Sequence, residues 1–311
     1  MITEKQHIKI KNWKRKGIAR LYNFWLGPVD PIRLDSFRVA LGLSMLMYMT
    51  AWWRYAEEWL TSAGFHVSTK AFISAPVFPL LPQASLPLFG TLLFGSLILW
   101  ILGIKTRAAS FIVLGCMVYV SFADHLASYT LNKLFIVALS VLVCVPQGSY
   151  WSLEHKEPSR QSVWPVRILQ ATLLILYFFC GWGKIFYGNW VEYPGVLWSQ
   201  VQGPYRTDLA AWMLRTFPAG IWSWMQYATL TFELLAPFLF ISRRFRVVGL
   251  WWGWGFQMMV ALTMHQLIYF SLAVLSFYVL FLEEKTLHRI RIFFTRGRQF
   301  YYANPKHETL N

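Results

Sequence analysis

The chain has 311 residues, of which 56% are hydrophobic, 18% aromatic and 14% charged. A soluble domain carries about a quarter charged residues, so this composition excludes an ordinary soluble enzyme and indicates a protein solvated mostly by lipid. The net charge of +15 does not indicate nucleic-acid binding, because the Lys and Arg residues cluster in short segments between apolar runs. Cytoplasmic loops of membrane proteins have this pattern.

The basic segment 1–33 precedes the first apolar run. Within it, residues 7–25 alternate basic and aromatic side chains at helical spacing, which predicts a helix at the cytoplasmic membrane surface. The first run begins near Leu34, and no cleavage site of small residues follows it. We therefore expect a retained helix and not a signal peptide.

Apolar runs near the length needed to cross a bilayer, about 20 residues, follow one another along the chain. They predict an all-α polytopic membrane helix bundle of about eight transmembrane helices over residues 34–283. A tight turn at 264–266 separates the last two. The runs are 34–53, 84–104, 108–124, 130–146, 165–183, 221–241, 245–264 and 266–282.

Basic residues mark every second connection, for example Lys105 and Arg107, or Arg243 and Arg244. Because Lys and Arg favour cytoplasmic loops, both termini are expected in the cytoplasm, including a basic tail over 284–311.

The external connections 54–83 and 185–220 are long, rich in Trp, Tyr and Pro, and only sparsely basic. Segments of this length are expected to form caps or partly re-entrant pieces over a cavity, or else flexible loops.

Three cysteines, Cys116, Cys144 and Cys180, each lie within an apolar run. Buried cysteine behaves as a small apolar residue, so packing is the expected role. No CxxC spacing typical of zinc sites is present, and no metal is expected.

Polar residues inside apolar runs are costly in hydrocarbon and need a partner or a purpose. In the first run Asp35 and Arg38 share one helix face, which predicts an internal ion pair. Later runs carry polar stripes at helical spacing, which predict a polar cavity open to the outside. The stripes comprise Gln170, Tyr177, Gly181 and Lys184 in one run, Gln226, Thr229 and Glu233 in the next, and then Gln257 and His265.

The roles of these residues have alternatives. Lys184 either extends its ammonium to water from the membrane edge, as lysines do there, or is a desolvated base. Glu233 is either a hydrogen-bonded buried carboxyl or a catalytic one, and His265 either caps a hairpin or belongs to the site. Asp124 and Lys133 form either a structural pair or part of a site.

The order of these features resembles the HTTM family, whose best-known member domain is the membrane part of the vitamin K-dependent gamma-glutamyl carboxylase. The most specific similarity is the YFFCGWGK…NWVE segment. The matching pieces are SFRVALGL at 36–43, LNKLFIVALSVLV…SYWSLE at 131–154, ILYFFCGWGKIFYGNWVE at 175–192, FELLAPFLF at 232–240 and IYFSLAVLSFYVLF at 268–281.

In the carboxylase, the lysine at this place is regarded as the base that deprotonates vitamin K hydroquinone on the lumenal side. The resemblance therefore implies that Lys184 is a base on the external side. The carboxylase also has an Asn–His pair, whereas the nearest pair here is Asn132–Lys133, without the histidine.

Together, the stripes and the resemblance give two sets of site residues. The expected catalytic residues are Lys184, Glu233 and Asn132, and the expected cofactor-binding residues are Tyr177, Gly181, Gln257 and His265.

The chain ends some thirty residues after the last run, so the large lumenal domain of the carboxylase is not expected. This short architecture resembles the SdpB-type proteins, which act with a small partner protein to mature an exported peptide toxin. The resemblance implies a multi-pass protein of a bacterial plasma membrane that is required for maturation or production of such a toxin. Its partners would be membrane lipids, a secreted precursor peptide and a small accessory protein.

Two other functions stay open. One is a carboxylase or oxidoreductase of the gamma-carboxylase type, which would use a quinone or another lipid as its cofactor. The other is a non-catalytic transporter, immunity or scaffold protein, in which the polar residues only pack.

Overall fold

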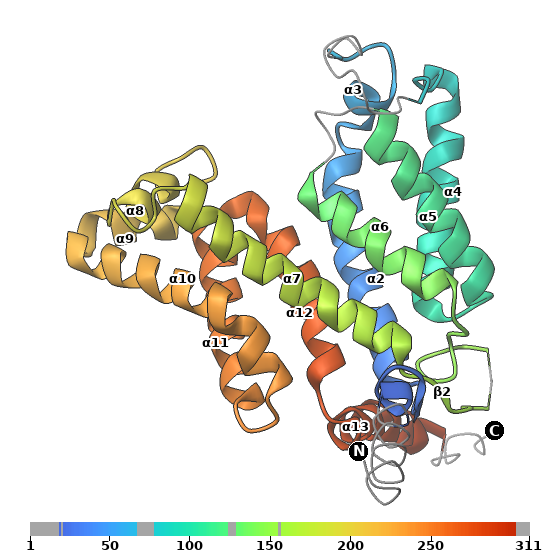
Figure 1. The fold of residues 1–311 in the computed structure, drawn as a ribbon. Helices are drawn as coiled ribbons and strands as arrows, with labels where there is room; N and C mark the ends of the chain where they lie inside the picture. Colours follow the sequence, from blue (N-terminus) through green and yellow to red (C-terminus); the bar gives the residue numbers. More distant parts are fainter. Residues whose placement is uncertain (1–18, 20, 67–77, 124–128, 155–156, 303–311) are drawn as a thin grey trace, which may run out of the picture.

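The computed structural model describes residues 19–302 except 20, 67–77, 124–128 and 155–156, with side chains described as far as Phe294. Its described part is a bundle of long helices, which confirms the all-α class (Figure 1). One pair of two-residue strands, β1 (Pro28–Val29) and β2 (Gln161–Ser162), runs antiparallel at one end of the bundle.

The long helices form two groups joined by α2, α7 and α12, as the ribbon shows (Figure 1). Each of the eight predicted runs overlaps one of them, because a long apolar segment in lipid satisfies its backbone polar groups only as a helix. The helices are α2 (Ile32–Trp53), α4 (Leu86–Leu102), α5 (Thr106–Ala123), α6 (Thr130–Val143), α7 (Trp164–Tyr187), α10 (Ala219–Ile241), α11 (Arg246–Thr263) and α12 (Ile268–Tyr278), the last continued by η4 (Val279–Phe281).

Fewer of these helices meet a strict requirement of length and apolar composition for crossing a membrane. Among the described residues, three do: Gln83–Leu102, Thr106–Ala123 and Trp164–Tyr187. A fourth is added if His265–Phe281 and Glu284–Phe294, which are bent by 113°, count as one broken span. The crossing number of eight and the side of each terminus therefore stay predictions.

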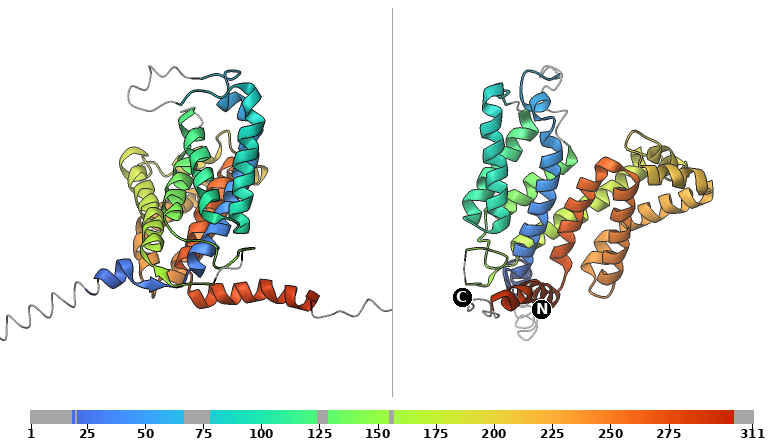
Figure 2. Two further views of the ribbon diagram at one scale, coloured as in Figure 1. Left: turned by 90° about the vertical axis from the view of Figure 1, so that its right-hand side faces the viewer. Right: turned by 180° about the vertical axis from the view of Figure 1, so that it is seen from behind.

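The basic and the aromatic-rich connections lie at opposite ends of the bundle. The connections α4–α5 and α10–α11 lie at the lower end in Figure 1, together with the β1–β2 pair and α13 (Glu284–Tyr302). Helix α13 crosses this end almost at right angles to the bundle (Figure 2). The sequence predicted only a basic tail where α13 lies. The surface helix predicted over 7–25 lies largely outside the described residues; in its neighbourhood the structure describes residues 21–26, which are helical.

Asp35 and Arg38 hold the lower end together, and both are fully buried. The two side chains form the predicted pair at 3.9 Å, yet their shorter contacts go to the backbone. Asp35 accepts hydrogen bonds from the amides of Gly148 (2.7 Å) and Tyr150 (2.6 Å). Arg38 donates to the carbonyls of Trp100 and Ile101, which end α4, and to that of Trp151. The pair thus satisfies helix-end and loop groups that would otherwise be buried without partners.

Asp124, the expected partner of Lys133, lies outside the described residues.

The upper end carries shorter elements. They are α3 (Ala56–Leu60), η2 (Gln83–Ser85), α8 (Val196–Val201), α9 (Asp208–Thr216) and η3 (His265–Leu267). Helices α8 and α9 pack through a separate apolar cluster against the first turn of α10, so the connection 185–220 forms a folded cap there and not an extended loop.

Candidate functional site

Helices α7 and α10 approach each other closely at Gly181. A Cβ added at Gly181 would lie 3.1 Å from the Cβ of Glu233 and 3.2 Å from the side chain of Leu234. Glycine therefore permits this approach, which brings Glu233 beside the last turn of α7.

The last turn of α7 places Lys184 against Glu233. The Nζ of Lys184 donates to Oε1 of Glu233 in an ion pair; 24% of the lysine side chain is exposed, but only 4% of the glutamate side chain. The ammonium also lies 4.8 Å from the centre of the Trp190 ring, a cation–π distance. Lys184 is thus turned towards a buried carboxylate and an indole, and not freely into the surrounding lipid or water.

Glu233 keeps one oxygen free. Its Oε2 is buried and has no hydrogen-bond partner within the described part of the chain. Buried polar atoms are normally satisfied, so this orphaned carboxylate oxygen needs an explanation, and a proton or a ligand received beside the lysine would supply one.

A second polar group lies deeper, where α7, α11 and α12 meet. The hydroxyl groups of Tyr177 and Tyr278 are 2.6 Å apart, and Nε2 of Gln257 donates to the Tyr177 hydroxyl over 2.9 Å. Gly253 makes room for this contact, since a Cβ there would lie 2.1 Å from the Tyr278 hydroxyl oxygen. All these side chains are buried.

Tyr278 did not figure among the predicted site residues. Ser271, Val274 and Tyr278 repeat at spacings of three and four and are all buried in the structure. This spacing was a signal that Tyr278 faces the interior of the bundle.

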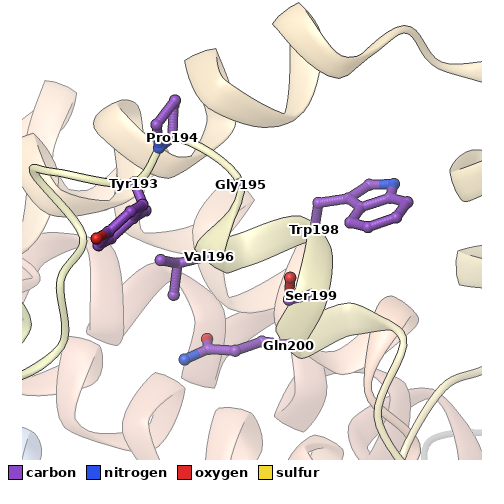
Figure 3. Close-up of a pocket in the computed structure, with 7 residues that line it drawn as sticks. All are labelled: Tyr193, Pro194, Gly195, Val196, Trp198, Ser199 and Gln200. Carbon is purple, nitrogen blue, oxygen red and sulfur yellow. The ribbon is translucent and has the colours of Figure 1, made fainter.

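The cap over the Lys184 end of α7 is fixed by Gln226. Its Nε2 donates to the carbonyls of Trp190 (2.7 Å) and Tyr193 (2.8 Å), and its Oε1 accepts from the amide of Leu197 (3.0 Å). A shallow pocket of about 630 Å³ opens along α8 in the same segment (Figure 3). It is lined by Tyr193, Pro194, Gly195, Val196, Trp198, Ser199 and Gln200.

The structure therefore brings Tyr177, Gly181 and Lys184 of α7 together with Glu233 and Gln257. Two further predicted residues lie elsewhere: Asn132 and His265. Asn132 is buried at the start of α6, where it contacts Tyr48 of α2. His265 is exposed in η3, and its backbone amide donates to the carbonyl of Tyr205.

Three of the residues expected to bind a cofactor, Tyr177, Gly181 and Gln257, already make contacts inside the bundle. The Tyr177 hydroxyl contacts the Tyr278 hydroxyl and accepts from Nε2 of Gln257, whose Oε1 has no partner among the described residues. The space beside Gly181 is occupied by Glu233 and Leu234. A quinone at these positions would have to replace contacts that the protein itself makes, so we assign no step to a quinone. No group of three or more metal-ligating side chains occurs among the described residues.

The Lys184–Glu233 pair suits proton transfer. An amine and a carboxyl joined by a hydrogen bond hold one shared proton, and the partly exposed lysine is the member of the pair that a substrate can reach. The pair can therefore take a proton from a bound group, and the ammonium can stabilise the negative charge that this leaves.

Comparison with known proteins gave one finding on family. Residues 26–285 match the family model described as the HTTM domain. Neither the curated proteins nor the solved structures gave a match.

Proposed function

Because the chain belongs to the HTTM family, a family of gamma-carboxylase-like membrane proteins, we propose that it serves the maturation or production of an exported peptide toxin. Its working site is the Lys184–Glu233 pair. In this proposal the chain lies in a bacterial plasma membrane, receives a secreted precursor peptide and acts with a small accessory protein, as SdpB-type proteins do.

The single observation that supports this site is the buried ion pair under a folded cap. Glu233 is held in the bundle with one oxygen free, while Lys184 keeps a quarter of its side chain accessible. Both groups lie at the end of the bundle away from the basic connections, which is the side where an exported precursor would arrive.

The test is to express the chain with its precursor peptide and accessory protein and to measure the mature extracellular peptide. Lys184→Ala and Glu233→Gln should each lower the yield at least about tenfold, since a positioned acid–base group contributes a factor of about 100 or more. Lys285→Ala is the control, because Lys285 is an exposed lysine on α13, at the opposite end of the bundle. Normal yield from Lys184→Ala at an unchanged membrane level would show that the site is wrong.

A second candidate function is a quinone- or lipid-dependent carboxylase or oxidoreductase. The observation that favours it is again the free Oε2 of Glu233 beside Lys184, because deprotonating a hydroquinone needs a proton acceptor at the membrane boundary. Mass spectrometry of lipids bound to the purified protein distinguishes the two: a stoichiometric quinone supports the carboxylase-type function.

If every single substitution of a polar site residue alters the abundance of the protein but never the peptide yield per molecule, the protein is a non-catalytic transporter, immunity factor or scaffold.

A further inference from the structure

Gln226 connects two parts of the site that are far apart in the sequence. It is completely buried on α10, and Glu233 follows it on the same helix two turns later. All three of its hydrogen bonds go to backbone groups between Trp190 and Leu197. A primary amide that uses both its donors and its acceptor on one segment fixes the position of that segment against the helix.

Trp190 is the side chain of this segment that reaches Lys184. Only 3% of Trp190 is exposed, and its backbone amide donates to the carbonyl of Lys184 over 3.3 Å. The ring lies 4.8 Å from the ammonium, on which Glu233 forms the other contact. The lysine head is therefore held between a carboxylate and an aromatic face, both of which attract a cation.

From these contacts we propose that Trp190 is a second fixed contact of the Lys184 ammonium and that Gln226 is the residue that positions Trp190. Trp190 and Gln226 together set how far the Nζ of Lys184 is shielded and thus how readily this amine reacts. This inference concerns the site of the proposed function, but its main readout, the reactivity of one amine, does not depend on that function.

The simplest alternative is that Gln226 only satisfies loop carbonyls and that Trp190 only fills space. In that case, substitutions that leave the protein folded would leave the Lys184 amine as reactive as before. The two accounts therefore differ in a measurable quantity.

The experiment compares the rates at which an acylating reagent modifies Lys184 and Lys133 in the purified full-length protein, read by mass spectrometry. Lys133 is the internal reference because it is exposed on α6. Trp190→Leu and Gln226→Met should raise the Lys184 rate relative to Lys133 at least about threefold, since a cation–π contact contributes about 0.5–1 kcal/mol or more. Trp190→Phe, which keeps a ring, should give an intermediate rate.

Folding is controlled within the same set. Trp190→Leu preserves every hydrogen bond of Gln226, because these bonds go to the backbone, so it tests the proposal even if Gln226→Met does not fold. An unchanged Lys184 rate in folded Trp190→Leu overturns the proposal. A raised Lys184 rate in Trp190→Leu, together with a normal peptide yield from Lys184→Ala, upholds the positioning role and instead rejects the proposed function of the site.

Discussion

The Lys184–Glu233 pair is asymmetric in its surroundings, and this has an energetic consequence. The lysine side chain is 24% exposed, whereas the carboxylate side chain is only 4% exposed between α7 and α10. Removing one member of a buried pair leaves a charge without compensation, which costs about 3–5 kcal/mol when both are fully buried.

We expect Lys184→Ala to lower the free energy of unfolding by about 3 kcal/mol. Glu233→Ala should cost less, because the freed lysine can extend to water. The double substitution Lys184→Met with Glu233→Leu should recover most of the loss, since an apolar pair leaves no buried charge. Denaturant titration of the purified protein checks this, and a double variant as unstable as Lys184→Ala would contradict it.

The buried tyrosines allow a finer comparison. The Tyr177 hydroxyl has two partners, Tyr278 and Gln257, whereas the Tyr278 hydroxyl has the Tyr177 hydroxyl as its hydrogen-bond partner. Tyr177→Phe should therefore destabilise the protein by about 1–2 kcal/mol more than Tyr278→Phe, because it leaves two buried polar groups unsatisfied. Equal losses of thermal stability in the two variants would show that Gln257 finds another partner.

At the scale of elements, glycines decide how closely the helices approach. On α11, Gly253 and Gly255 are two residues apart but meet different surroundings. A Cβ at Gly253 would overlap the Tyr278 hydroxyl at 2.1 Å and the Phe232 ring at 2.8 Å, whereas a Cβ at Gly255 meets nothing within 4 Å.

Gly253→Ala should therefore lower stability by about 1–3 kcal/mol through overpacking. Gly255→Ala, its control, should be neutral or stabilising by up to about 1 kcal/mol, because alanine is the better helix former. Adding Tyr278→Phe to Gly253→Ala should restore part of the loss by removing the clashing oxygen. Thermal unfolding of the three variants tests this, and an equal effect of the two alanines would exclude close packing at Gly253.

The elements that sequence reasoning predicted are those set by local pattern. Apolar runs dictate helices in lipid, and spacing placed Tyr177, Gly181 and Lys184 on one face of α7. The reading of Lys184 as a freely extending lysine could not be tested before its contacts with Glu233 and Trp190 were known, because both come from other parts of the chain. Pattern alone cannot reveal a partner that depends on how two helices cross.

Other features were missed for identifiable reasons. The polar sequence of α13 predicted a tail and no packed helix. Its buried Leu287 contacts Ile32 and Tyr150, which come from distant parts of the chain. Asn132 was grouped with the site through the Asn–His pair of the carboxylase, and His265 through the polar stripe that it shares with Gln257. Neither argument fixes where a residue lies around the bundle, and both residues lie away from the Lys184–Glu233 pair.

For the molecule as a whole, the separation of basic and aromatic ends predicts its direction in the membrane. Basic connections favour the cytoplasm, so α8 should be external and the α10–α11 connection internal. Single cysteines test this in a background without Cys116, Cys144 and Cys180.

Ser199→Cys on α8 should react with a membrane-impermeant thiol reagent in intact cells, and Arg244→Cys should react only after permeabilisation; both positions are exposed. Protection of Ser199→Cys together with labelling of Arg244→Cys in intact cells would invert the topology and remove the external site with it.

The close approach at Gly181 also bears on how the chain is made. Lys184 is synthesised almost fifty residues before Glu233, and α8 and α9 lie between them in the sequence. While the ribosome is still extending the chain, the lysine has no carboxylate, and its charge must remain at the membrane surface, where water can reach it. The packing of α10 against Gly181 then neutralises that charge, so α7 and α10 can close around Lys184 only after Glu233 has been synthesised.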